Sequence, residues 1–167
     1  MDEIKIVYKA LGEITPYEKN PRKNDDAVPF VKNSIQQFGF KVPLIIDEGG
    51  CIVAGHTRYK AAQELGMEKV PCIMASDLTP EQVKALRIAD NKTAEKAEWD
   101  TELLTQEIKD LAGKFDMEDF GFGDFELSIM MEGFDESAID DLFADAPEKK
   151  KEPKQIRCPH CGEMIDV

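Results

Sequence analysis

The chain has 167 residues, of which 42% are hydrophobic and 33% are charged, and its formal net charge is -13 at pH 7. This length allows one main domain with additions and a core of ordinary size, so neither stabilising disulfides nor obligate disorder is required. No apolar run approaches the roughly 18 residues of a transmembrane helix, and the first residues are acidic. We therefore expect a soluble, cytoplasmic protein without a membrane partner.

The acidic excess lies in one block of the sequence. Residues 1–98 carry 14 basic and 15 acidic side chains, residues 99–148 carry 2 and 16, and residues 149–167 carry 5 and 3. The overall charge argues against a general polyanion binder, but the balanced first segment can hold a face that binds phosphate groups. We expect the acidic block to oppose non-specific DNA binding at that face, although a merely solvating role stays open.

The first half of the chain begins with alternating strand and helix signals. A strand is predicted over residues 4–8, and the helix after it is capped by Asp25 or Asp26 and ended by Gly39. A β-branched run, turn residues and a second apolar run then predict a hairpin over residues 42–54.

The following elements continue the same alternation. A helix is predicted over residues 57–65 and a strand over residues 70–74. Thr79 carries the signature of a helix start, and Asp100 caps a further helix. The acidic, aromatic stretch beyond is expected to fold over the domain, with a last short helix over residues 137–143.

This order of elements predicts an α/β (α+β) fold, with a mixed sheet and flanking helices, followed by an acidic helical extension and a Cys-x-x-Cys tail. Four segments are expected: a main domain over 1–99, the extension over 100–146, a linker over 147–156 and the tail over 157–167.

The junction between the hairpin and the next predicted helix reads Gly55-His56-Thr57-Arg58. The unpaired N–H groups and the dipole of a helix start favour an anion. Gly55 allows close backbone approach, Thr57 offers a hydroxyl, and Arg58 offers a planar guanidinium suited to phosphate oxygens. Composition alone leaves a blander interpretation open, a tight turn with a surface ion pair, because the motif is neither a P-loop nor a dinucleotide fingerprint.

Two further polar clusters, residues 20–22 and 90–95, each predict a loop when taken alone. If the sheet brings all three clusters to one edge, their cations and hydrogen-bonding groups would surround one anion. Composition does not show that they converge. The residues in question are Arg22, Arg58, Lys92, Asn91 and Thr93.

Five motifs occur in a recognisable order: residues 20–22, 34–40 with 43–46, 54–62, 70–72 and 90–95. In order and spacing they resemble the ParB N-terminal domain of the ParB/sulfiredoxin superfamily, over roughly residues 4–99. The chain looks similar to the ParB-like domains of phages and mobile elements, which are often fused to DNA-modification methyltransferases.

The resemblance implies an α/β domain that binds a nucleoside triphosphate with Mg²⁺, CTP in chromosome-segregating members, with the Gly-x-x-Arg loop on the phosphates. Partitioning proteins show Glu-Asn-x-x-Arg where this chain has Ala94 in the Arg position. The choice between CTP and ATP, and hydrolysis, therefore stay open. The candidate cofactor-binding residues are Arg22, Gly55, His56, Thr57, Arg58, Asn91, Lys92 and Thr93.

The function expected from this resemblance is that of a nucleotide-binding regulatory or adaptor module of a phage or mobile element, acting in DNA modification, packaging or partitioning. Its expected partners are DNA or a DNA-processing protein of methyltransferase or terminase type, and a second copy of the chain.

Two alternatives to this function stay open: an enzyme on the same fold (a nuclease, NTPase or small-molecule kinase), and an acidic interaction module without nucleotide binding. No catalytic residue is assigned, because Asp90 and Glu95 are the only acids in the recognised loops. Sulfiredoxin activity is not expected, because His56 occupies the place of the reacting cysteine.

The four cysteines form two groups. Cys51 and Cys72 lie in predicted strands and are expected to be buried free thiols. Cys158 and Cys161 have the spacing of a zinc knuckle, with two thiolates on one tetrahedral zinc. The chain lacks a second such pair, so a partner chain would have to supply the remaining ligands; an unligated thiol pair is the alternative.

Overall fold

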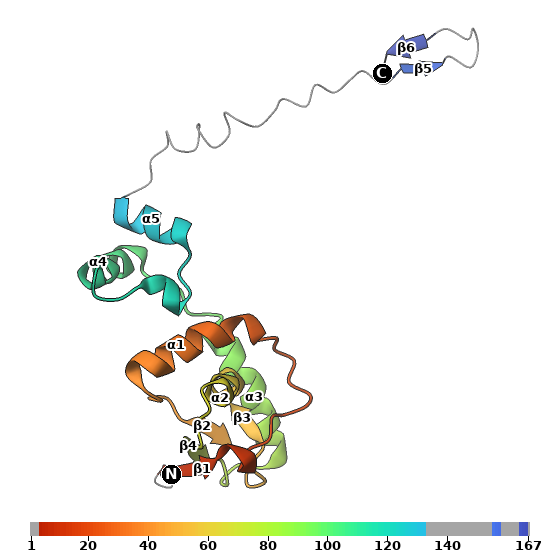
Figure 1. Cartoon of the computed structure of the whole chain (residues 1–167). Coiled ribbons are helices and arrows are strands. Elements are labelled where there is room, and N and C mark those ends of the chain that lie inside the picture. The colour runs from red at the N-terminus through yellow and green to blue at the C-terminus, as the bar shows by residue number, and fades with distance from the viewer. Residues whose placement is uncertain (1–3, 133–154, 158–163, 167) are drawn as a thin grey trace. The chain divides into compact units, whose positions relative to one another are not determined.

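A computed structural model of the chain describes residues 4–132, 155–157 and 164–166. The chain divides into two compact units, Met1–Met131 and Glu132–Val167 (Figure 1). Among the described residues, no helix has the length and apolar character needed to cross a membrane. The segment boundaries expected from composition stay predictions.

Four strands form one mixed sheet in the order β1-β4-β2-β3. β4 pairs antiparallel with β1 and parallel with β2, and β2 and β3 form the predicted antiparallel hairpin. The mixed α/β fold is therefore confirmed, and strand ends differ from their predicted positions by one or two residues. The strands are β1 (Ile6–Ala10), β2 (Leu44–Ile46), β3 (Ile52–Ala54) and β4 (Lys69–Met74).

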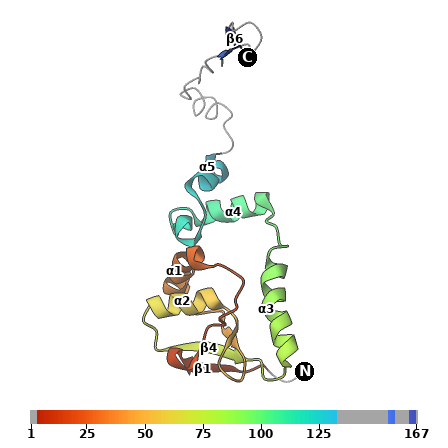
Figure 2. The ribbon, with the colours of Figure 1, turned by 90° about the vertical axis from the view of Figure 1, so that its right-hand side faces the viewer.

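Helices cover one face of this sheet and the β3 part of the other. α2 (His56–Glu64) lies on one face with α1 (Val28–Phe38) packed on top of it, and α3 (Pro80–Ala94) packs against β3 (Figure 2). Because side chains alternate along a strand, neighbouring residues of β2 and β3 face the two helical layers. The core under α2 contains Ile14, Leu44, Ile46, Ile52, Tyr59, Ala62, Val70 and Cys72, and the core under α3 contains Val53, Ala75 and Val83.

Helix ends follow the predicted caps in two of three cases. The Thr79 hydroxyl accepts the Gln82 N–H at 3.3 Å, and the Gln82 side chain accepts the Thr79 N–H at 2.8 Å. Asp100 caps the next helix as predicted. The prediction for α1 was wrong: both candidate caps lie in a 3₁₀ turn, η2 (Asp25–Ala27), and α1 starts after it without a side-chain cap. Pro29 in its first turn offers no N–H for such a cap.

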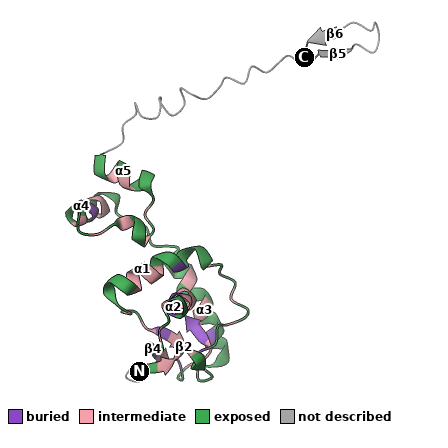
Figure 3. Cartoon of the chain, viewed as in Figure 1, coloured by how far each residue is buried: buried purple, intermediate pink, exposed green. Residues whose placement is uncertain are grey.

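The described part of the acidic block, residues 99–132, contains α4 (Thr101–Leu111), the 3₁₀ turn η3 (Met117–Phe120) and α5 (Asp124–Glu132). It packs on α1 through aromatic rings: the Phe38 ring centroid lies 5.7 Å from that of Phe115 and 5.4 Å from that of Phe120. Most of its surface is exposed, whereas buried residues gather in the sheet and α2 (Figure 3). The aromatic stretch thus folds over the domain as expected.

The second unit contains two paired strands, β5 (Gln155–Arg157) and β6 (Met164–Asp166), with Arg157 opposite Met164. The predicted zinc ligands Cys158 and Cys161 fall between them, outside the described residues. The predicted helix over residues 137–143 and most of the predicted linker fall outside them as well.

Candidate functional site

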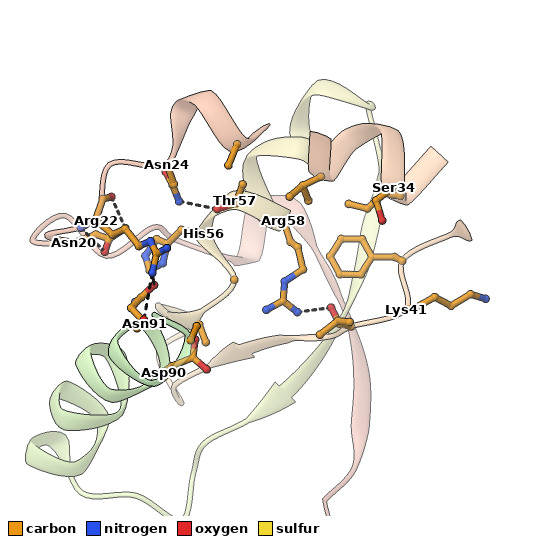
Figure 4. A pocket seen from close by; sticks show the side chains of 18 of the residues that line it. Asn20, Arg22, Asn24, Ser34, Lys41, His56, Thr57, Arg58, Asp90 and Asn91 are labelled. Atoms are coloured by element: carbon orange, nitrogen blue, oxygen red, sulfur yellow. Dashed lines mark hydrogen bonds between the residues drawn. The ribbon is translucent and has the colours of Figure 1, made fainter. Parts of the chain in front are cut away.

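A cavity of about 750 Å³ opens where α1, the start of α2 and the end of α3 meet (Figure 4). One part of its lining is charged, with four cationic side chains and two carboxylates: Arg22, Lys23, Lys41, Arg58, Asp26 and Asp90. Another part is apolar and includes Val31, Ile35, Phe38, Phe40 and Val42. The cavity thus offers positive charge and apolar surface to one ligand.

Gly55 forms the turn between β3 and α2, with φ of 103°. This left-handed conformation is strained for any residue with a Cβ. A Cβ here would also lie 2.7 Å from Cδ2 of Leu44 and 3.2 Å from Nη2 of Arg58. The glycine therefore leaves room for the Arg58 side chain beside the first turn of α2.

Arg58 extends from α2 along the cavity wall (Figure 4). Its Nη1 donates to the carbonyl oxygens of Val42 and Pro43, both at 2.6 Å. Burial lowers the pKa of the guanidinium, while the Asp90 charge raises it. The surface ion pair of the blander interpretation is not what the structure has, because Arg58 pairs with backbone carbonyls. Within the described residues, its Nε and Nη2 have no protein acceptor.

His56 opens α2 and is half-buried at the cavity. Its Nε2 accepts the backbone N–H of Tyr17 at 3.3 Å. Burial lowers the pKa of the imidazole, and the charges of Arg87 and Lys60 lower it further. The ring is therefore held neutral, with its proton assigned to Nδ1 by the bond at Nε2.

Thr57 and Lys60 tie α2 to the loop that precedes α1. The Thr57 hydroxyl accepts the Asn24 side-chain N–H at 2.9 Å, and Nζ of Lys60 donates to Asn24 at 3.0 Å and also to Asp25. Lys60 is thereby neutralised by a surface carboxylate.

The loop over residues 20–24 and the end of α3 also meet. Nη1 of Arg22 donates to Oδ1 of Asn91 at 3.1 Å and to its carbonyl at 3.4 Å. Asn91 in turn donates to the carbonyl of Arg87 at 2.8 Å. All three clusters seen in the sequence therefore border one cavity, to which they contribute Arg22, Gly55, His56, Thr57, Arg58 and Asn91.

Two of the predicted residues are not in the cavity lining. Residues 90–94 are helical, contrary to the predicted loop, so their side chains point in different directions around α3. Asp90, Asn91 and Ala94 line the cavity. Lys92 instead pairs with Glu95 at 2.7 Å, which lowers the pKa of that exposed carboxyl. The Thr93 hydroxyl donates to the Ala89 carbonyl at 2.8 Å.

Sequence reasoning missed several lining residues, above all Lys41, Asp26 and Ser34. Lys41 lies between the glycine that ends α1 and strand β2, at the same edge as the turn after β3. From this position next to the predicted hairpin, Lys41 could have been predicted to lie near the site. Arg87 belongs to none of the motifs.

The two described cysteines, Cys51 and Cys72, are both free thiols. Cys72 is buried as expected, Cys51 is only half-buried, and burial raises the pKa of both thiols. In the described parts of the chain, no three His, Cys, Asp or Glu side chains cluster closely enough to hold a metal ion.

Comparison with known proteins agrees with the motifs. The model of the ParB N-terminal domain family matches residues 2–104. The ParB-like nuclease domain-containing protein YnaK of Escherichia coli K12 is 46% identical over 82 residues, 48% of this chain and 94% of that protein. The chromosome-partitioning protein Spo0J of Thermus thermophilus is 31% identical over 91 residues, which cover 52% of this chain but only 34% of the partitioning protein.

A solved structure has the same fold. The C-terminally truncated chromosome-partitioning protein ParB of Caulobacter crescentus, complexed with CTP-gamma-S, superposes with a TM-score of 0.63. The match covers 84% of this chain and 85% of that one at 20% sequence identity.

Proposed function

Because the chain belongs to the ParB N-terminal domain family, we propose that its cavity binds a nucleoside triphosphate, with CTP as the first candidate and ATP as the second. The main support is the cavity itself, in which a helix N-terminus and four cations lie beside an apolar wall. Phosphate groups match the first feature and a planar base matches the second.

The triphosphate is placed over the turn 55–58. The first N–H groups of α2 have no acceptor inside the helix, and α2 has nine residues, long enough to hold a helix dipole at its start. Arg58 is fixed by two carbonyls and has two N–H-bearing nitrogens left without a protein acceptor in the described residues. A bidentate contact to phosphate needs such a preset guanidinium.

Arg22, Lys23 and Lys41 supply the remaining positive charge around the phosphates. Arg22 is also relevant to the departure from the family motif. Partitioning proteins have an arginine at the position that is Ala94 here. In this chain Arg22 instead places a guanidinium beside Asn91. Asp90 fits Mg²⁺, which commonly binds one or two carboxylates together with phosphate oxygens.

The proposal is for binding rather than hydrolysis or nucleic-acid cleavage. The described cavity contains two carboxylates, Asp26 and Asp90. Nuclease activity, suggested by the name of the relative YnaK, is the second candidate. It is tested by incubating the full chain with single- and double-stranded DNA and Mg²⁺, beside an Asp90→Asn variant.

Titration calorimetry of the full chain with CTP, ATP and GTP in the presence of Mg²⁺ tests the main proposal. Arg58→Ala removes a charge-assisted contact of about 1.5 to 3 kcal/mol, so affinity should fall at least roughly tenfold. Arg58→Lys should lose affinity as well, because an ammonium group cannot form the fork. Lys32→Ala, which removes a cation paired with Glu64 outside the cavity, is the matched control. Unchanged affinity in Arg58→Ala would contradict this placement.

We also propose that the module acts in a DNA transaction of a phage or mobile element, as a dimer or with a DNA-processing protein. Relatedness to chromosome-partitioning proteins supports a role near DNA. Duplex binding, measured by fluorescence anisotropy across a salt series with and without CTP, tests it. Substituting amides for the carboxylates of α4 and α5 should strengthen non-specific binding if the acidic block shields the cationic face.

For the tail, we propose a zinc ion shared by Cys158 and Cys161 of two chains. The pairing of β5 with β6, which brings the two ends of that segment together, supports a knuckle. Metal analysis read beside the mass in solution tests it, and one zinc per strictly monomeric chain would contradict it.

A further inference from the structure

Arg87 is the least exposed arginine or lysine in the described ion pairs, with 10% of its side chain accessible. It lies on α3 and reaches the hairpin: Nε donates to the Ile52 carbonyl at 3.1 Å, and Nη2 donates to Oδ2 of Asp47 at 3.4 Å. Nη2 also contacts Sγ of Cys51 at 3.6 Å. One guanidinium therefore fastens α3 to the turn and second strand of the hairpin.

The face of the same guanidinium holds a loop that belongs to the cavity. Its central carbon lies 4.0 Å from the centroid of the Tyr17 ring, a cation–π contact. The backbone N–H of Tyr17 donates to Nε2 of His56, which lines the cavity and opens α2. Two successive contacts thus connect Arg87 with the first residue of the helix that we assign to the phosphates.

The backbone of Arg87 supports the opposite wall. Its carbonyl accepts the side-chain N–H of Asn91 at 2.8 Å, which orients the Asn91 oxygen that accepts from Arg22. Arg87 itself does not line the cavity. We infer that Arg87 is a positioning residue for the nucleotide site, holding both His56 and the Tyr17 loop in register with α3. This inference rests on the proposed function.

The chemistry explains why this position needs arginine. Burying a cation is costly unless its hydrogen bonds are satisfied, so a purely structural role would favour an apolar side chain. Here the guanidinium meets a carbonyl, a carboxylate and an aromatic face in three directions at once. A lysine ammonium cannot stack flat on a ring while donating sideways to two acceptors.

Substitutions of Tyr17 test the inference while Arg87 keeps its other bonds. Tyr17→Phe preserves the cation–π contact and serves as the conservative variant, whereas Tyr17→Leu removes it. In calorimetry of the full chain with CTP and Mg²⁺, we expect roughly tenfold weaker binding for Tyr17→Leu, because the loop loses its cation–π anchor on Arg87. Tyr17→Phe should stay within about twofold of the original chain. Equal affinities for Leu and Phe variants would overturn the inference.

Arg87→Lys gives the second arm, with Lys84→Gln on the exposed side of the same helix as the control. Affinity should fall in Arg87→Lys and not in Lys84→Gln. An unchanged affinity in Arg87→Lys, in a chain with unchanged circular dichroism, would overturn the inference that the site needs the guanidinium of Arg87.

A readout independent of nucleotide separates this inference from the proposed function. The chain has two histidines, and His160→Gln identifies the signals of His56 in ¹⁵N NMR. In Tyr17→Leu the backbone N–H of residue 17 is still present, but its loop is no longer anchored on Arg87, so this N–H should move away from Nε2 and the imidazole should lose its single tautomer. An unchanged tautomer overturns the positioning inference, whereas an original chain that binds neither CTP nor ATP overturns the proposed function.

Discussion

On one side of the cavity, the turn 55–58 is fixed by its backbone: a left-handed glycine, a helix start and a guanidinium held by two carbonyls. On the other side, the end of α3 meets the Arg22 loop through hydrogen bonds between exposed side chains. The first arrangement tolerates almost no change of shape, while the second can be rebuilt by small rotations. The two sides should therefore respond differently to substitution.

The largest effect is expected at Gly55. In Gly55→Ala, the left-handed backbone and the collision with Leu44 add up to a loss of about 2 to 5 kcal/mol in the free energy of unfolding. Urea unfolding measures this loss. Gly66→Ala is the matched control, because its φ is 65° and a Cβ there meets nothing within 4 Å, so only strain of about 1 to 2 kcal/mol remains. Equal losses in both variants would contradict the steric argument.

A smaller effect is expected on the opposite side. Asn91→Ala removes the acceptor of Arg22 and one bond to the Arg87 carbonyl, which should weaken CTP binding roughly fivefold, or about 1 kcal/mol, with little change in stability. Asn91→Asp keeps the acceptor but loses the N–H donated to the Arg87 carbonyl and adds a negative charge beside the phosphates, so it should not restore the affinity. Titration calorimetry checks both, and a loss of stability as large as that of Gly55→Ala would remove the contrast between the two sides.

The stability of the folded chain should depend on pH through His56. Its pKa is lower in the folded chain than the ordinary 6.5, so the unfolded chain takes up a proton first as the pH falls. Stability should therefore rise with pH from the lowered pKa up to about 6.5 and level off above it. Urea midpoints between about pH 5 and pH 8 test this, with His56→Gln as the control that should remove this part of the dependence. A midpoint that falls with rising pH in this window would contradict it.

The smallest effect is expected for Lys92 and Thr93, the two predicted site residues whose side chains lie outside the cavity lining. Lys92→Ala and Thr93→Ala should leave CTP affinity within about twofold, because both side chains lie outside the cavity lining and the Lys92–Glu95 pair is exposed and screened by solvent. Lys23→Ala removes a cation from the lining and serves as the positive control. Calorimetry that showed a larger loss for Lys92→Ala than for Lys23→Ala would place the ligand elsewhere.

The sequence was informative where local chemistry is strong. Gly55 as a turn and Thr79 as a cap could be predicted, because each depends on residues within a few positions along the chain. The cluster at residues 90–95 misled, because its polar composition is typical of a loop although the backbone continues as α3 through Ala94. Whether a residue of this segment lines the cavity or faces solvent then depends on its angular position around the helix.

Arg87 and Lys41 belong to none of the motifs that pointed to the site. Their importance depends on contacts with segments far away in the chain: Arg87 meets Tyr17 and Asp47, and Lys41 reaches the cavity through the fold of the sheet edge. Only the pairing of strands across the sheet brings such residues together. An arginine within a helix carries no local sign of that role.

The sheet order also constrains how the chain can fold. β4, the last strand of this sheet to be synthesised, lies between β1 and β2, and in the sheet β1 pairs with β4 alone. Val7 pairs with Cys72, so β1 cannot pair in the sheet during synthesis until β4 has left the ribosome. Contacts between such distant residues slow folding and leave apolar strands exposed meanwhile. Val7, the β1 side chain that packs against the core, therefore stays exposed until β4 is available.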